Sequence, residues 1–185
     1  MKIRQHGRYQ YSPIFNRPIY TWPNKKKLAF YIALNIEHFS FGEGLGHTPT
    51  NPGPQPDVRN FAWRDYGLRV GIWRIFDLLD ELGLPACHLM NSSIYDYAPE
   101  IPQRIRQRGD EFVGHGRTNS EQQSDYSEDH ERTLINDVVS IFKRHEGKGL
   151  DGWMGPWISE SEVTPDLLKE AGCSCLLYTS PSPRD

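Results

Sequence analysis

Hydrophobic residues occur along this chain in two alternating patterns, short continuous runs and longer repeats with helical spacing. The runs have strand length and are KLAFYIALNI (27–36), LPACHLM (84–90), EFVGH (111–115) and GLDGWMGPW (149–157), the last including its loop. The first run is apolar almost throughout, so we expect it to be buried on both faces. The helical repeats span 67–83, which ends at Gly83, 98–108 and 127–145. Strands alternating with helices predict βαβ units in a parallel sheet or barrel.

Three further segments complete this pattern. The stretch 37–62 is rich in Gly and Pro, which exclude regular structure, and a loop this long in a compact domain is typically functional; it is a candidate lid. Thr164-Pro165-Asp166 has the composition of an N-cap and first helical turn, and predicts a helix up to Gly172. The SEDHER run (127–132) is expected to be a solvated first turn.

The last residues depart from the alternation of strands and helices. EAGCSCLLY begins like a fifth strand, but LLYTSPSPRD follows without a helix and resembles the translation of a sequencing adapter. We therefore expect an N-terminal extension (1–24), one folded domain (25–172) and a non-native tail (173–185), with the natural protein continuing beyond Gly172. The alternative is a short disordered end, which the Ser and Pro content also suits.

The composition argues against nucleic-acid binding, a membrane contact and a cysteine-based framework. The 185 residues carry 21 Lys and Arg against 24 Asp and Glu, a net charge of -3, and no basic stripe, so nucleic acid is not expected as a partner. No signal-type segment or apolar run of about 18 residues is present, which predicts a cytoplasmic protein without a membrane contact. Three cysteines, two of them spaced CxC, favour neither a disulfide framework nor a cysteine zinc site.

Polar residues that directly follow the apolar runs are the first candidates for chemistry. Ligands of parallel α/β folds gather at the carboxyl ends of strands. Three segments occupy such positions, namely Asn35 to His38, His115 to Glu121 and Trp153 to Trp157.

Several blocks of the chain resemble the polysaccharide deacetylase, or NodB-homology, family, and most of all its branch with the allantoinase-like proteins. The blocks are NIEHF, WRDYGLRVGIWRIFDLLDELGLPACHL, GDEFVGHGRTNSE, DGWMGPWISE and TPDLLKEAG, which together run from about residue 25 to 172. The resemblance implies a distorted TIM-like (β/α) barrel, here incomplete at the C-terminus, that hydrolyses carbon–nitrogen bonds other than peptide bonds.

The family pattern assigns roles to residues after the first, third and fourth strands. It has an Asp-Asp pair, in which the first Asp is the base and the second a metal ligand, then His-x-x-x-His and Arg-x-Pro. In this chain Glu37-His38 replaces the pair, Asn119 replaces the second His, and Met154 replaces the Arg. The resemblance thus implies Glu37 as catalytic base.

The residues also support other interpretations of this site. Glu37 can act as general base if burial lifts its pKa toward the operating pH, or it can tie down the long loop through an N-cap or a contact with Arg64 or Arg69. His38, His115 and Asn119 form the candidate metal set, for one divalent ion such as zinc. A carboxamide is a poor zinc ligand, so the site can equally be free of metal.

Substrate contacts are expected from Arg64, Arg117, Glu121 and Trp157, although solvated loop charges and core packing are the plain alternatives for such side chains. The partner would be a small-molecule or carbohydrate substrate, and assembly into a homo-oligomer stays open. A second hypothesis is a catalytically inactive barrel that binds a carbohydrate or a small heterocycle. An unclosed barrel exposes strand edges and its apolar interior, so we expect residues 1–185 alone to aggregate and to be inactive.

Overall fold

Five short parallel strands form a single sheet. The structure is a computed structural model that describes residues 7–48 and 56–177. The strands lie in the order of the sequence, β1-β2-β3-β4-β5, and are β1 (Ala33–Ile36), β2 (Cys87–Met90), β3 (Glu111–Gly114), β4 (Gly152–Trp153) and β5 (Cys175–Leu176). Each strand pairs in parallel with the next. Within the described residues the sheet does not close, so β1 and β5 are its edges.

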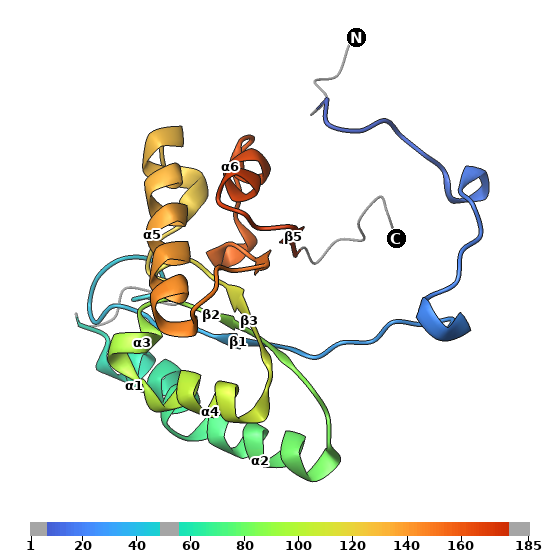
Figure 1. Cartoon of the computed structure of the whole chain (residues 1–185). Helices are drawn as coiled ribbons and strands as arrows, with labels where there is room; N and C mark the ends of the chain where they lie inside the picture. The colour runs from blue at the N-terminus through green and yellow to red at the C-terminus, as the bar shows by residue number, and fades with distance from the viewer. Residues whose placement is uncertain (1–6, 49–55, 178–185) are drawn as a thin grey trace.

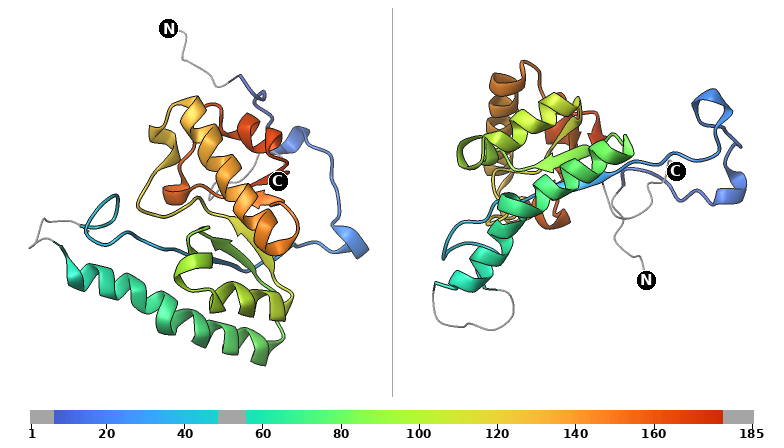
Figure 2. Two further views of the ribbon diagram at one scale, coloured as in Figure 1. Left: turned by 60° about the vertical axis from the view of Figure 1, so that its left-hand side comes forward. Right: turned by 90° about the horizontal axis from the view of Figure 1, so that it is seen from below.

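Helices connect the strands and lie along one side of the sheet (Figures 1 and 2). They are α1 (Val58–Tyr66), a π-helical turn (Gly67–Gly71), α2 (Ile72–Leu82), α3 (Ile94–Tyr97), α4 (Glu100–Arg108), α5 (Glu128–Glu146) and α6 (Thr164–Glu170). Short 3-10 turns span Ile14–Asn16, Pro23–Lys25, Gln123–Asp125 and Pro156–Ile158. None of the helices in the described ranges has the length and apolar character needed to cross a membrane.

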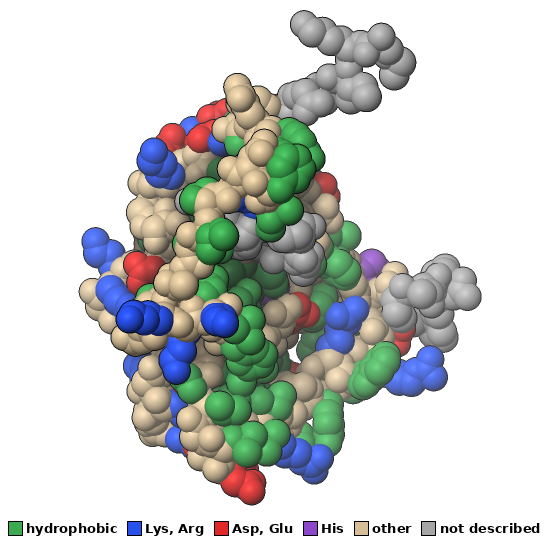
Figure 3. All heavy atoms as spheres, turned by 90° about the vertical axis from the view of Figure 1, so that its right-hand side faces the viewer, with side chains coloured by type: hydrophobic (Ala, Val, Ile, Leu, Met, Phe, Trp, Pro, Cys, Tyr) green, Lys and Arg blue, Asp and Glu red, His purple; other side chains and the backbone are tan. Residues whose placement is uncertain are grey.

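The two faces of the sheet differ in how they are covered. Side chains alternate across a strand, and those directed toward the helices, such as Ile36, Met90 and Trp153, enter the main core. The helices contribute Phe76, Ile105 and Phe142 to the same core. The opposite face carries a small cluster of Leu89, Val113 and Met154. Figure 3 shows hydrophobic side chains gathered around a hollow on the right-hand side of the molecule as drawn in Figure 1.

The sequence prediction for the first strand was too long. Only Ala33–Ile36 pairs with β2, and Leu28, Phe30 and Tyr31 are 78%, 81% and 64% exposed. Burial on both faces is therefore wrong for this run, because the exposed residues precede β1 and lie outside the paired strand. The segment before it runs away from the body as an arm and touches α6 where Arg8 pairs with Asp166 at 2.6 Å (Figure 1).

Two expected boundaries also shift. The helix predicted for 67–83 begins at Val58, inside the expected loop, because Asp57 caps it by accepting a hydrogen bond from the Asn60 N–H at 2.9 Å. Residues 49–55 of the loop lie outside the described residues. Gly83 ends the helix in the left-handed region at φ 63°, as predicted. Thr164 is the first residue of α6, whose cap position is Val163, so the expected N-cap role of Thr164 is wrong.

Glu131 contradicts the expectation of a solvated turn at SEDHER. It is 0% exposed, and its carboxylate accepts hydrogen bonds from Ser161 Oγ at 2.6 Å, Gln123 Nε2 at 3.1 Å and Thr164 Oγ1. Gln123 in turn accepts from the indole N–H of Trp153 at 3.1 Å. These bonds tie α5 to β4 and to the segment that precedes α6.

The fifth strand confirms the prediction from EAGCSCLLY, and it lies within the segment expected to be a tail; residues 178–185 are outside the described residues. Cys87, Cys173 and Cys175 are all free thiols.

Candidate functional site

Four polar side chains converge at the carboxyl ends of the first three strands. Glu37 follows β1, Asn91 follows β2, and His115 and Asn119 follow β3. Asn91, His115 and Asn119 are buried, whereas Glu37 keeps some exposure. The sheet thus brings together residues that are far apart in the sequence, as parallel α/β folds do at this edge.

The imidazole ring of His115 forms a hydrogen bond through one ring nitrogen, and its other ring nitrogen has no hydrogen-bond partner among the described residues. Its Nδ1 donates a hydrogen bond to the Met154 carbonyl oxygen at 2.6 Å. Its Nε2 lies 3.5 Å from Oε1 of Glu37 and has no hydrogen-bond partner among the described residues. Nδ1 carries the donated proton, so Nε2 faces the carboxylate as a lone pair when the ring is neutral and as an N–H donor when the ring is protonated; only the donor form lowers the pKa of Glu37.

Asn91 organises the rest of the site. Its Oδ1 accepts from the His38 backbone N–H at 2.7 Å, while its Nδ2 donates to the His115 carbonyl and, at 3.0 Å, to Oδ1 of Asn119. These backbone partners fix the orientation of the Asn91 amide. Asn119 must therefore present oxygen to Asn91 and its Nδ2 donor toward Glu37.

Glu37 is an ionised acceptor at neutral pH. Burial raises its pKa, but contacts with the side chains of His115, Asn35 and Asn119 outweigh that effect and hold the pKa below its ordinary value. Asn35 donates to Oε1 of Glu37 at 3.1 Å. The hypothesis that burial lifts this pKa toward neutrality is therefore wrong, because amide donors and an imidazole surround the carboxylate.

His38 points away from this group. Its Nδ1 lies 2.9 Å from Ser93 Oγ, and its ring stacks on Tyr97 with centroids 4.2 Å apart. Burial lowers its pKa, which favours the neutral ring. The strand alternation that makes neighbouring residues face opposite ways accounts for this separation from Glu37.

The residues do not fit a zinc centre. No group of three or more His, Cys, Asp or Glu side chains that could hold a metal ion occurs among the described residues. Glu37 and His115 face each other, but the oxygen of Asn119 is occupied by Asn91 and His38 contacts Ser93. Two ligands fall short of the three that catalytic zinc sites typically use.

The four expected substrate contacts have different surroundings. Arg117 and Glu121 form a two-bond ion pair at 3.0 Å for each bond, and Glu121 also accepts from Tyr126 at 2.7 Å, so they stabilise their own loop. Trp157 is 46% exposed and donates from Nε1 to the Asn119 carbonyl at 3.0 Å. It adopts φ 62°, an unusual conformation for a residue other than Gly. Arg64 lies over the Phe39 ring, 3.9 Å from its centroid.

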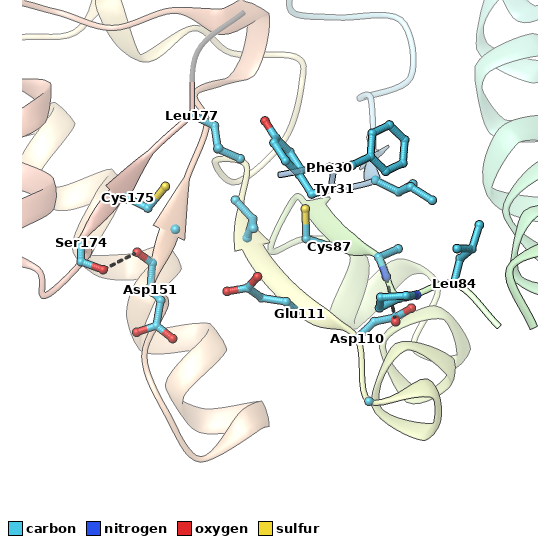
Figure 4. Close-up of a pocket in the computed structure, with 16 residues that line it drawn as sticks. Phe30, Tyr31, Leu84, Cys87, Asp110, Glu111, Asp151, Ser174, Cys175 and Leu177 are labelled. Carbon is cyan, nitrogen blue, oxygen red and sulfur yellow. Dashed lines mark hydrogen bonds between the residues drawn. The ribbon is translucent and has the colours of Figure 1, made fainter. Parts of the chain in front are cut away.

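A larger cavity of about 700 Å³ lies elsewhere, on the uncovered face near the amino ends of the strands. Figure 4 shows Phe30, Tyr31, Cys87, Glu111 and Cys175 around it. It contains neither Glu37 nor His115. We place the candidate site at the opposite strand ends because the interacting titratable groups are there.

Sequence reasoning missed Asn91 and the contribution of the Met154 carbonyl. Asn91 directly follows the LPACHLM run and could have been found by the same strand-end rule that selected Glu37 and His115. The Met154 carbonyl carries no side-chain signal, so only the tertiary structure reveals it.

No family model matches this sequence, and neither does any curated protein. Among solved structures, the fold is similar to that of a proposed polysaccharide deacetylase from Mycobacterium smegmatis, with 24% identity and a TM-score of 0.68 over 83% of this chain and 51% of that one. PuuE allantoinase matches with 20% identity and a TM-score of 0.71 over 89% and 59% of the respective chains. A CE4 family pseudoenzyme from Bacillus anthracis matches with 13% identity and a TM-score of 0.56 over 80% and 42%.

These likenesses confirm the expected fold class, an α/β fold of the TIM-like (β/α) barrel type whose barrel is not closed. The kinds of protein that the sequence resemblance implied, polysaccharide deacetylases and an allantoinase, are those found among the similar structures. The chain spans about half the length of these structures.

Proposed function

We propose that the protein hydrolyses carbon–nitrogen bonds other than peptide bonds, in an N-acetylated sugar or a ureide. The observation that carries this proposal is the pair formed by Glu37 and the unpartnered Nε2 of His115. A carboxylate and an imidazole lone pair that face each other provide two proton acceptors at one point, where a water molecule can be activated. The proposed domain is the one expected for residues 25–172, in a cytoplasmic protein.

The chemistry assigns a role to each residue of the pair. Glu37 is ionised and accepts a proton from the attacking water, and His115 shares this task because the low pKa of Glu37 makes the carboxylate a weak base. The water oxygen then bonds to the amide carbon, and the C–N bond breaks as the collected proton passes to the leaving nitrogen. The Nδ2 group of Asn119 is a donor for the oxyanion.

The Met154 carbonyl acts as a positioning group in this proposal. By accepting from Nδ1 of His115, it fixes both the ring orientation and the tautomer. No step requires a metal, in keeping with the poor fit of these side chains to a zinc centre.

The alternative is a barrel that binds a carbohydrate or small heterocycle without turnover. It is favoured by the low basicity of Glu37 and by the similarity in fold to a pseudoenzyme. It is also favoured because Oδ1 of Asn119 and Nδ1 of His38, which could bind a metal ion, are engaged by Asn91 and Ser93. Trp157 on the rim would then supply a flat contact surface.

The test is a hydrolysis assay on the 185-residue chain and on any longer product of the same gene. Acetate release from N-acetylglucosamine oligomers would identify a deacetylase, and ring opening of a cyclic ureide an allantoinase-like enzyme. Glu37→Gln should lower kcat by roughly 10²- to 10⁴-fold, the usual contribution of general base catalysis, without altering the melting curve. Calorimetric binding with no product under any condition, metal ions included, would replace the proposal by the alternative.

A further inference from the structure

Arg64 is an arginine beside the candidate site that lacks a carboxylate partner. Its side chain forms no hydrogen bond or ion pair with any residue in the described ranges, and its Nε is buried. The nearest acidic residue in the sequence, Asp65, is occupied by Arg69 and by the hydroxyl of Tyr97 at 2.5 Å. Asp57, at the opposite end of the helix that carries Arg64, caps α1 by accepting a hydrogen bond from the Asn60 N–H. The charge of Arg64 is therefore available to a ligand.

The guanidinium is nevertheless held in place. It stacks on Phe39, which is itself 5% exposed and meets Trp157 edge to face with centroids 6.4 Å apart. Gly46 lies so close to Phe39 that a Cβ there would come within 2.6 Å of the ring. Asn60 secures that loop by donating to the Gly46 carbonyl at 2.8 Å. An arginine ordered in this way has lost part of its freedom before binding, which favours affinity for an anion.

Arg64 and Glu37 line the same cavity. Its volume is about 260 Å³, and most of its remaining wall is apolar, from Leu34, Ile36, Leu68, Ile72 and Ile75. Such a volume suits a small molecule of a few heavy atoms and is small for an oligosaccharide. The two charged groups do not form an ion pair with each other, so each can address a different part of one ligand.

The charges of Glu37 and Arg64 determine the orientation of a ligand in this cavity. Glu37, which lines this cavity although His115 does not, is ionised and repels an anion, so the neutral amide must lie at Glu37 while a negative group lies at Arg64. We infer that the substrate is a low-molecular-weight amide with a carboxylate or similar anionic group at one end, and that Arg64 is the residue that recognises this group. The inference rests on the proposed function, since it specifies the substrate class of the same site.

The experiment compares two small probes that differ in one charge. Oxamate carries an amide and a carboxylate, and oxamide carries two amides. Calorimetry at constant ionic strength on the 185-residue chain should show that oxamate binds more tightly than oxamide by roughly tenfold or more, the range of a charge-assisted hydrogen bond. Arg64→Gln should remove this preference and leave oxamide binding unchanged.

Two further variants separate recognition from folding. Arg69→Gln alters a neighbouring, exposed arginine that already pairs with Asp65, and it should keep the preference for oxamate. Arg64→Lys keeps the charge but not the planar, two-pronged donor, and should give an intermediate preference. Melting curves followed by circular dichroism show whether each variant is folded.

Equal binding of both probes, failure of both to bind, or an unchanged preference in Arg64→Gln would overturn the inference. These results differ from a failure of the proposed function. If oxamate is preferred but no amide is hydrolysed, the anion site stands and hydrolysis falls. If neutral amides are hydrolysed without any preference for an anionic end, the proposed hydrolysis stands and the inferred role of Arg64 is wrong.

Discussion

Nε2 of His115 and Oε1 of Glu37 lie 3.5 Å apart, and each belongs to a different strand end of the parallel sheet. Neither residue alone distinguishes a functional site from an ordinary buried histidine or a loop carboxylate. Their juxtaposition does, because a buried acceptor without a partner is costly unless a proton, water or ligand occupies the space beside it.

Removing the imidazole should raise the pKa of Glu37. Burial already acts in that direction, and the contact with His115 is the largest effect that opposes it. We expect the carboxyl carbon of Glu37 to titrate below the ordinary value in the wild type and at higher pH in His115→Gln, as followed by carbon-13 NMR. A midpoint that does not move would show that His115 does not govern this carboxylate.

Asn91 should matter more for stability than its small size suggests. Asn91→Leu removes three hydrogen bonds and leaves the Asn119 side chain and two backbone groups unsatisfied. We expect a loss of about 2–4 kcal/mol in the free energy of unfolding, measured in urea. Asn136→Ala, at an exposed position of α5, is the control and should change stability by no more than about 0.5 kcal/mol. Equal effects of both substitutions would contradict the prediction.

The buried carboxylate of Glu131 should also be essential for folding stability. Glu131→Ala leaves Ser161, Gln123 and Thr164 without their shared acceptor and opens a cavity, so a loss of about 2–4 kcal/mol is expected. Glu128→Ala removes a carboxylate from the same first turn, but Glu128 is 55% exposed and its pair with Arg132 contributes little. Chemical denaturation of the two variants side by side checks the difference.

Acid should destabilise the fold through His88. Burial lowers the pKa of His88, although Asp110, 2.9 Å from Nε2, opposes this effect. The unfolded chain therefore binds more protons once the pH falls through about 6.5, and stability decreases toward acid. His88→Gln can still donate to Asp110 without titrating, so its unfolding free energy should change less between pH 7.5 and 5.5.

Two groups besides His88 also contribute to the pH dependence of stability. His38 also has a lowered pKa and remains in the variant, so the pH dependence should shrink without vanishing. The pKa of Asp110 is lowered too, because hydrogen bonds from His88 and Arg108 outweigh burial, but its contribution is lost only below about pH 4. An unchanged slope in His88→Gln would exclude His88 as the source.

The uncovered face of the sheet should make the 185-residue chain associate. Phe30 and Tyr31 are largely exposed and border the cavity of about 700 Å³, beside an edge strand. We expect light scattering after size exclusion to show mass that rises with concentration. Phe30→Ser should reduce this association more than Phe15→Ser, which alters an exposed residue of the arm away from the cavity. A monomer at all concentrations that melts cooperatively would contradict the prediction.

The sequence by itself determined the architecture. Apolar runs and helical repeats predicted all five strands and the alternation with helices, because burial period and strand length are local properties of the chain. The strand-end rule also selected Glu37, His115 and Asn119, and it would have selected Asn91 had it been applied to the second strand.

Only the tertiary structure decided how these residues act. The exposure of residues 28–31 follows from the place of β1 at an edge of the described sheet, and the burial of Glu131 depends on donors that come from distant segments. The lowered pKa of Glu37, the orientation of the Asn119 amide and the free charge of Arg64 likewise depend on side chains brought together from separate βα units. Local pattern fixes which elements form, whereas electrostatics and hydrogen bonding depend on distances that no single segment of sequence contains.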